Sequence, residues 1–175
     1  MKSFVCLGFA LLLAACGSDN KSGVQSAAPG VPPPDPEIET FPSEGSTHVP
    51  AGTQIVYNTD PPTSGSHYPE AQEGGYFETA IASGYLVHSM EHGAVIIYYN
   101  PATVTASQKD SLKALAATYP GFFGQVVCVP RDDPTYPIIL TAWTHRLRLA
   151  TYDQSRIDGF LALYRGNGPE SAPSP

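Results

Sequence analysis

The middle of the chain reads LVHSMEHG at residues 86–93 and continues directly into AVIIYY at residues 94–99. The first half holds two of the chain's five histidines, together with a methionine and a carboxylate. The second half is an uninterrupted apolar and aromatic run, which is typical of a strand buried on both faces. We therefore expect this stretch to supply both the centre of a sheet and the functional site.

The backbone conformation of the histidine-rich half decides which side chains can act together. In an extended chain His88, Met90 and His92 point to one face, and two imidazoles with a thioether suit copper. In a helical turn His88, Glu91 and His92 share a face instead, and zinc is then the better assignment. The apolar run that follows favours the extended form, whereas Gly93 is typical of a helix end. We expect a bent, mostly extended segment, and therefore copper ahead of zinc.

A second unusual segment reads PPTSGSHYP at residues 61–69. Its composition excludes regular structure, and Gly65 would allow a tight turn beside a site. The segment supplies His67, and His48 lies a short way upstream. The predicted metal ligands are His67, His88, Met90, Glu91 and His92, with His48 as a possible addition. The alternative is that these histidines only satisfy local backbone groups.

The spacing His88-x-x-Glu91-His92 also matches the inverted zincin signature, in which the glutamate acts as a base. Such enzymes need a downstream glutamate as third zinc ligand. The only later glutamate is Glu170, in a stretch that we expect to be disordered. We therefore disfavour this interpretation.

The remaining pattern predicts an α+β domain. Strands are expected at residues 54–57, 94–99, 122–129 and 138–149, and helices at residues 105–119 and 152–165. Thr105 and Gln108 have capping-box spacing, and apolar stripes place Leu112 and Phe160 on the buried faces of the two helices. The order is one strand followed by β-α-β-β-α. This order predicts a small, mostly antiparallel sheet with both helices on one face and a loop-rich N-terminal entrance.

Residues 1–15 have the features of a signal peptide. Lys2 precedes an apolar run that is too short to span a bilayer permanently. The run ends in LAAC at residues 13–16, which resembles a bacterial lipoprotein signal. This resemblance implies cleavage before Cys16 and acylation of its thiol, and two or more acyl chains hold a protein on a membrane. The expected location is the bacterial cell envelope, on the periplasmic or outer side, and the outer membrane in a Gram-negative host.

The predicted domain organisation follows from composition. Residues 16–46 comprise the lipidated Cys16 and a segment rich in proline, serine and glycine that should form a disordered tether. Removal of residues 17–46 should leave thermal stability nearly unchanged. Residues 47–166 should form the globular domain, and residues 167–175 a second disordered tail. The net charge is −7 and the nine lysines and arginines are scattered, which argues against nucleic acid as a partner. Cys128 lies in an apolar run and should be a buried core thiol.

The two unusual segments together resemble a known family. The patterns YN-x-x-PPTSG-x-H at residues 57–67 and LVH-x-x-EHG at residues 86–93 are similar to the signature of the bacterial domain-of-unknown-function family numbered 3105. The resemblance implies a secreted or membrane-anchored protein without an established reaction. It also implies that His67, His88, Glu91 and His92 belong to one site, whereas the position of Met90 is usually another apolar residue.

Three functions remain open. The first is a lipid-anchored domain that binds a transition metal, copper or zinc, for sequestration or for delivery to an unidentified protein. The second is a metal-dependent hydrolase or oxidase with Glu91 as base. The third is a non-catalytic interaction module whose histidines only stiffen loops. A closed four-ligand group favours the first, an open position beside Glu91 the second, and separated histidines the third.

Overall fold

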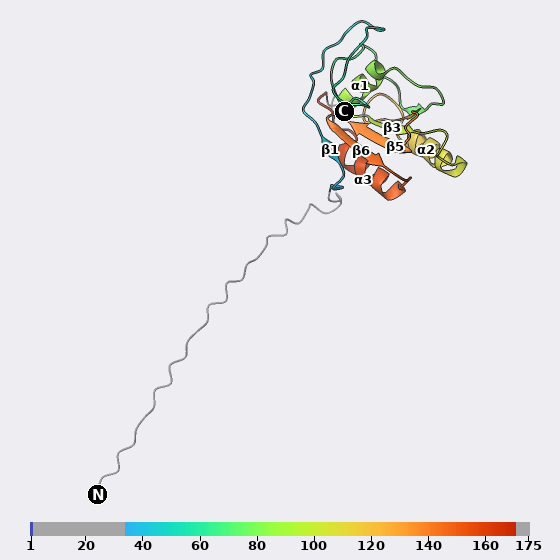
Figure 1. Ribbon diagram of the computed structural model, residues 1–175. Helices are drawn as coiled ribbons and strands as arrows, with labels where there is room; N and C mark the ends of the chain where they lie inside the picture. Colours follow the sequence, from blue (N-terminus) through green and yellow to red (C-terminus); the bar gives the residue numbers. More distant parts are fainter. Residues whose placement is uncertain (2–33, 171–175) are drawn as a thin grey trace.

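The computed structural model describes residue 1 and residues 34–170 of the chain (Figure 1). The predicted signal peptide, Cys16, most of the tether and residues 171–175 lie outside the described residues. Within the described part, no helix is both long and apolar enough to cross a membrane. The elements are β1 (Glu39–Thr40), β2 (Gly75–Tyr76), α1 (Ser83–Glu91), β3 (Val95–Tyr99), α2 (Ala106–Thr118), β4 (Val126–Pro130), β5 (Ile138–Ala142), β6 (His145–Leu149) and α3 (Gln154–Tyr164).

The strands form one sheet of six, in the order β1-β6-β5-β3-β4-β2. The α+β class is confirmed, and β3 lies inside the sheet as expected. However, the sheet is mixed rather than mostly antiparallel. β3 pairs antiparallel with β5 but parallel with β4, because α2 carries the chain back across the sheet before β4 begins.

Side chains of β3 alternate between two apolar cores, one on each face of the sheet. Val95 and Ile97 face a core that contains Leu112 of α2 and Phe160 of α3, so the two predicted helices do cover the same face. Ile96 faces a second core, which contains the apolar side chains of α1. In Figure 1, α1 lies above the strands and α3 below them. Helix α1 corresponds to the helical alternative for residues 88–92, which the sequence interpretation disfavoured.

The structure confirms the predicted start of α2 and corrects several other element boundaries. The Thr105–Gln108 capping box opens α2 as expected. Helix α3 begins after Asp153, whose side chain accepts a hydrogen bond from the Arg156 N–H. The predicted strand at residues 138–149 is two strands, β5 and β6, separated by a turn at Thr144 with φ of 62°. The predicted strand at residues 54–57 is wrong. Residues 54–57 have no strand partner within the described part of the chain, and the Tyr57 hydroxyl instead donates to the Ser66 carbonyl.

The last part of the tether predicted at residues 16–46 contacts the folded part of the chain. Arg156 of α3 binds Asp35 and Glu37, with nitrogen–oxygen distances of 2.6 Å to each. Glu39 of β1 binds Arg146 and Arg148 on β6 at 2.9 and 3.1 Å. The prolines of this stretch indicate a flexible segment. However, the carboxylates at every second position, Asp35, Glu37 and Glu39, pair with arginines that are distant in the sequence and come together only in the folded chain. Ion pairs therefore hold residues 35–40 against α3 and β6.

Candidate metal centre

Helix α1 presents the histidine-rich motif on one face. The predicted extended conformation is wrong, and the helical alternative is correct. His88, Glu91 and His92 have i, i+3, i+4 spacing and therefore share a face. Met90 is fully buried in the apolar core between α1 and the sheet. Gly93 follows the helix with φ of 81°, the conformation that commonly ends a helix.

The loop at residues 61–67 holds His67 against α1. Gly65 has φ of 117°, and a Cβ atom there would lie 3.2 Å from the ring of Tyr57, so this turn requires glycine. The Thr63 carbonyl accepts a hydrogen bond of 2.8 Å from the Thr144 N–H, which ties the loop to the turn between β5 and β6. His67 is completely buried. Its position is therefore fixed by the surrounding loop.

His48 joins the group from the domain entrance. It forms a short parallel bridge with His67, in which the His67 N–H donates to the Thr47 carbonyl and the Val49 N–H donates to the His67 carbonyl. The His48 ring centroid lies 4.8 Å from that of His67 and 5.0 Å from that of His88. His48 is exposed, so the group reaches the protein surface at this residue.

His48, His67, His88 and Glu91 form a group that could hold a metal ion. Each offers one ligand atom, and the four atoms lie within 4.8 Å of one another. Metal–nitrogen bonds are about 2 Å long, so closing the group around one ion requires side-chain movements of about 1 Å or less. Of the predicted ligands, the structure thus brings together His67, His88 and Glu91 with His48.

Two of the imidazoles are oriented by backbone carbonyls. Nδ1 of His67 lies 2.9 Å from the Gly65 carbonyl, and Nδ1 of His88 lies 2.7 Å from the Tyr68 carbonyl. A carbonyl oxygen only accepts, so each Nδ1 carries a proton and donates it. In the neutral rings Nε2 then presents its lone pair to the centre of the group. This arrangement is typical of histidines that ligate metals.

Glu91 and His67 face each other in an unusual contact. Glu91 Oε2 lies 3.0 Å from His67 Nε2, and both side chains are almost fully buried. The contact lacks hydrogen-bond geometry, and neither atom has another partner among the described residues. Two electron-rich atoms buried side by side are costly unless a proton or a cation lies between them.

His88 also lies against His92. Their Nε2 atoms are 2.9 Å apart. Burial lowers the pKa of His88 below its ordinary value, and the nearby rings of His67 and His92 lower it further, against the opposing effect of the Tyr68 carbonyl. Because Nδ1 of the neutral His88 ring donates to the Tyr68 carbonyl, its Nε2 is the acceptor in the contact with His92, and the His92 Nε2–H is the donor.

Glu170 is the site residue that the sequence interpretation missed. Its N–H donates to the Glu91 carbonyl at 3.0 Å, and its Oε2 lies 3.7 Å from Nδ1 of His92. Upstream, the Gly166 N–H donates to the Gly93 carbonyl at 2.8 Å. Residues 167–170, the first part of the predicted tail at residues 167–175, are thus packed on the end of α1. The only signal in the sequence was that Glu170 is the sole glutamate after Glu91.

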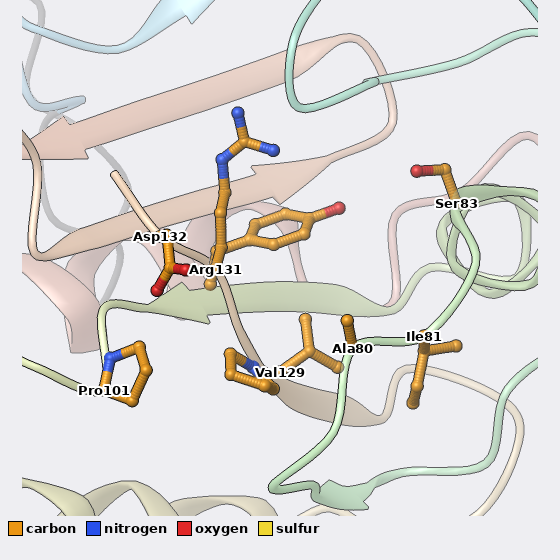
Figure 2. A pocket seen from close by; sticks show the side chains of 9 residues that line it. Ala80, Ile81, Ser83, Pro101, Val129, Arg131 and Asp132 are labelled. Carbon is orange, nitrogen blue, oxygen red and sulfur yellow. The ribbon is translucent and has the colours of Figure 1, made fainter. Parts of the chain in front are cut away.

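Other candidate features lie elsewhere. Nδ1 of His145 lies 2.8 Å from the Trp143 carbonyl, and its ring stacks on Tyr164. A cavity of about 510 Å³ is lined by residues that include Ser83 and Arg131 (Figure 2). None of the predicted metal ligands lines this cavity. It is therefore not part of the histidine group.

Comparison with protein families agrees with the two motifs. A family described as "Protein of unknown function (DUF3105)" matches residues 48–175. The chain belongs to this family. The DUF3105 match begins at His48, so every residue of the histidine–glutamate group lies within the DUF3105 segment. Comparisons with curated proteins and with solved structures gave no match.

Proposed function

We propose that this DUF3105 domain binds one transition metal ion through His48, His67, His88 and Glu91. The observation that carries the proposal is the buried contact between His67 Nε2 and Glu91 Oε2, 3.0 Å apart and without a hydrogen bond. A cation bound by both atoms would remove their repulsion. The orientation of His67 and His88 by backbone carbonyls supports the same conclusion.

The donor set favours zinc. Three imidazoles and one carboxylate form a borderline nitrogen–oxygen set, which suits zinc and copper(II). Copper was placed first in the sequence interpretation because of the soft thioether of Met90. That side chain lies in the apolar core, so the reason for preferring copper(I) is lost. We propose zinc ahead of copper.

Binding is favoured over catalysis. A catalytic zinc ion keeps an open position for water or substrate, whereas four protein ligands complete a tetrahedral site. Glu91, the base in the hydrolase alternative, is itself a member of the ligand group. We propose a role in holding or delivering metal at the bacterial cell envelope. The domain would be anchored through acylated Cys16, and a protein partner for delivery would act in the same compartment.

The test is metal binding by the full chain in detergent, measured by elemental analysis and by titration calorimetry. The parent should bind one zinc ion per chain. His67→Ala and His88→Ala should each weaken binding by at least about 100-fold, because each removes a direct ligand. His145→Ala removes a histidine outside the group, and Met90→Leu removes the buried thioether. Both controls should bind as the parent does.

Circular dichroism of the four variants would establish that each remains folded. A folded parent that binds neither zinc nor copper would disprove the proposal and support the interaction module. A loss of copper binding specific to Met90→Leu would restore the thioether as a ligand.

A further inference from the structure

His92 lies at the edge of the proposed metal centre. Its Nε2 is 2.9 Å from Nε2 of His88, which belongs to the four-ligand group. His92 itself is not part of that compact group. The imidazole of His92, which could bind a metal ion, therefore lies next to the proposed ligand His88 without being one of the four ligands.

Exposure to solvent increases from the group towards His92 and beyond it. The side chains of His67 and Glu91 are 0% and 2% exposed. The side chain of His92 is 14% exposed, and that of Glu170 is 59% exposed. Exposure thus rises from the buried ligands through His92 to Glu170.

The His92 ring is held in place by its neighbours, but one of its two ring nitrogens lacks a hydrogen-bond partner in the part of the chain that the structure describes. Phe123 packs edge-on against it, with ring centroids 4.9 Å apart, and the His92 carbonyl accepts a hydrogen bond from the Gly124 N–H. Nδ1 of His92 is buried and has no hydrogen-bond partner among the described residues.

Glu170 is placed to supply that missing partner. Its carboxylate lies 3.7 Å from Nδ1, and its backbone N–H is anchored to the Glu91 carbonyl. A small rotation of the Glu170 side chain would let it accept the Nδ1 proton. In the metal-free structure the His92 Nε2–H donates to His88 Nε2. Once a metal ion occupies the His88 lone pair, a proton on Nδ1 facing Glu170 would leave the His92 Nε2 lone pair available to that ion, as in other carboxylate–histidine pairs that serve metals.

We propose that His92 is an exchange ligand, which passes a metal ion between a carrier in solution and the buried group, and that Glu170 positions it. This inference rests on the proposed metal-binding function. In each step one metal–ligand bond forms as another breaks, at constant oxidation state, so no redox partner is required. The carrier would be a small chelator or a protein that offers nitrogen or oxygen donors.

The test is the transfer of zinc from the loaded full chain to the chromophoric chelator 4-(2-pyridylazo)resorcinol, followed by stopped-flow absorbance. His92→Ala should slow the transfer by about tenfold or more while the chain still binds one zinc ion. Glu170→Gln should slow it by a smaller factor, and Glu170→Asp, which keeps the carboxylate, should recover most of the rate. Glu78→Gln makes the same charge change at another exposed position and should have no effect.

Cobalt(II) absorption separates an exchange ligand from a permanent one. The visible spectrum of the cobalt-loaded chain should be the same in His92→Ala and the parent, because an exchange ligand is not bound at rest. A changed spectrum, or loss of zinc binding, would make His92 a permanent ligand and overturn the inference. An unchanged transfer rate in His92→Ala would also overturn it and would indicate that ions leave past exposed His48.

The two proposals fail in different ways. If the parent binds no metal, the proposed function itself is wrong. If the parent binds metal but His92→Ala transfers it at the parental rate, only the exchange role is wrong.

Discussion

Met90 and Glu91 are neighbours in the chain, but they serve different parts of the molecule. One step along a helix turns the side-chain direction by roughly 100°. Met90 therefore packs into the apolar core on the sheet, while Glu91 enters the histidine group. A residue type suited to metal binding is informative only once the backbone conformation is known.

The Glu91–His67 contact leads to a prediction that distinguishes a metal site from a buried ion pair. Glu91→Gln should weaken zinc binding but leave the free energy of unfolding of the metal-free protein unchanged or slightly higher. The reason is that a glutamine amide can donate a hydrogen bond to the lone pair on His67 Nε2, which a carboxylate cannot do. Urea unfolding with and without a chelator would measure both effects.

The opposite result would indicate a buried ion pair. If His67 is an imidazolium held by Glu91, removing the carboxylate's charge should destabilise the metal-free protein by about 3–5 kcal/mol. Ser89→Ala is not a suitable control, because the Ser89 hydroxyl donates to the Gln72 and Tyr85 carbonyls. His145→Ala serves better, since that residue lies outside the group.

At the scale of elements, the strong periodic patterns were predicted and the short or irregular ones were not. Helix α2 has a capping box and an apolar stripe, and both features of the sequence predict the helix that the structure shows. Helix α1 has only nine residues and runs almost directly into a buried strand, so the apolar run of β3 biased the prediction towards extension. Its conformation is fixed by packing on the sheet rather than by local preference.

The acidic N-terminal segment gives a prediction at the same scale. Its contacts to α3 and β6 mean that removing residues 17–46 should lower thermal stability, contrary to the expectation from composition. The smaller changes Asp35→Asn and Glu39→Gln should each lower the free energy of unfolding at pH 7 by about 1 kcal/mol. Glu78→Gln changes an exposed glutamate that makes none of these contacts and should have little effect.

This stabilisation should depend on pH in a defined direction. The Arg156 guanidinium holds the pKa of Asp35 below its ordinary value, and Arg146 does the same for Glu39. Stability from a lowered carboxyl pKa is present above the unfolded-state pKa, about 4, and is lost as pH falls through the folded-state pKa. The difference between parent and variants should therefore shrink below about pH 4 in urea titrations. A difference that persists at pH 2 would mean that packing, not charge, is responsible.

At the scale of the whole molecule, the site combines segments that are distant in sequence. The motifs identified His67, His88 and Glu91 because their residue types and spacing are unusual, and His48 was a possible addition. Glu170 could not be predicted, since its place beside His92 depends on how residues 166–170 pack on the end of α1. Tertiary contacts of this kind leave no local pattern in a sequence.

The proposed anchor gives a prediction about the location of the intact chain. Cys16→Ser removes the thiol that would be acylated, so the chain should move from the membrane fraction to the soluble fraction. Labelling with a palmitate analogue, followed by fractionation, would measure this change. Cys128→Ser is the matched control, because Cys128 is a buried core thiol. Membrane association that survives Cys16→Ser would exclude the acyl anchor.

A metal ion in the histidine group would also connect two segments that are distant in the sequence. Cys128 is the only cysteine among the described residues, and burial raises the pKa of its thiol to about 12. An ion held by His48, His67 and α1 would crosslink the irregular residues 41–74 to the helix, as a disulfide crosslinks distant segments in many small domains. The supply of metal would then control how long residues 41–74 resist proteases.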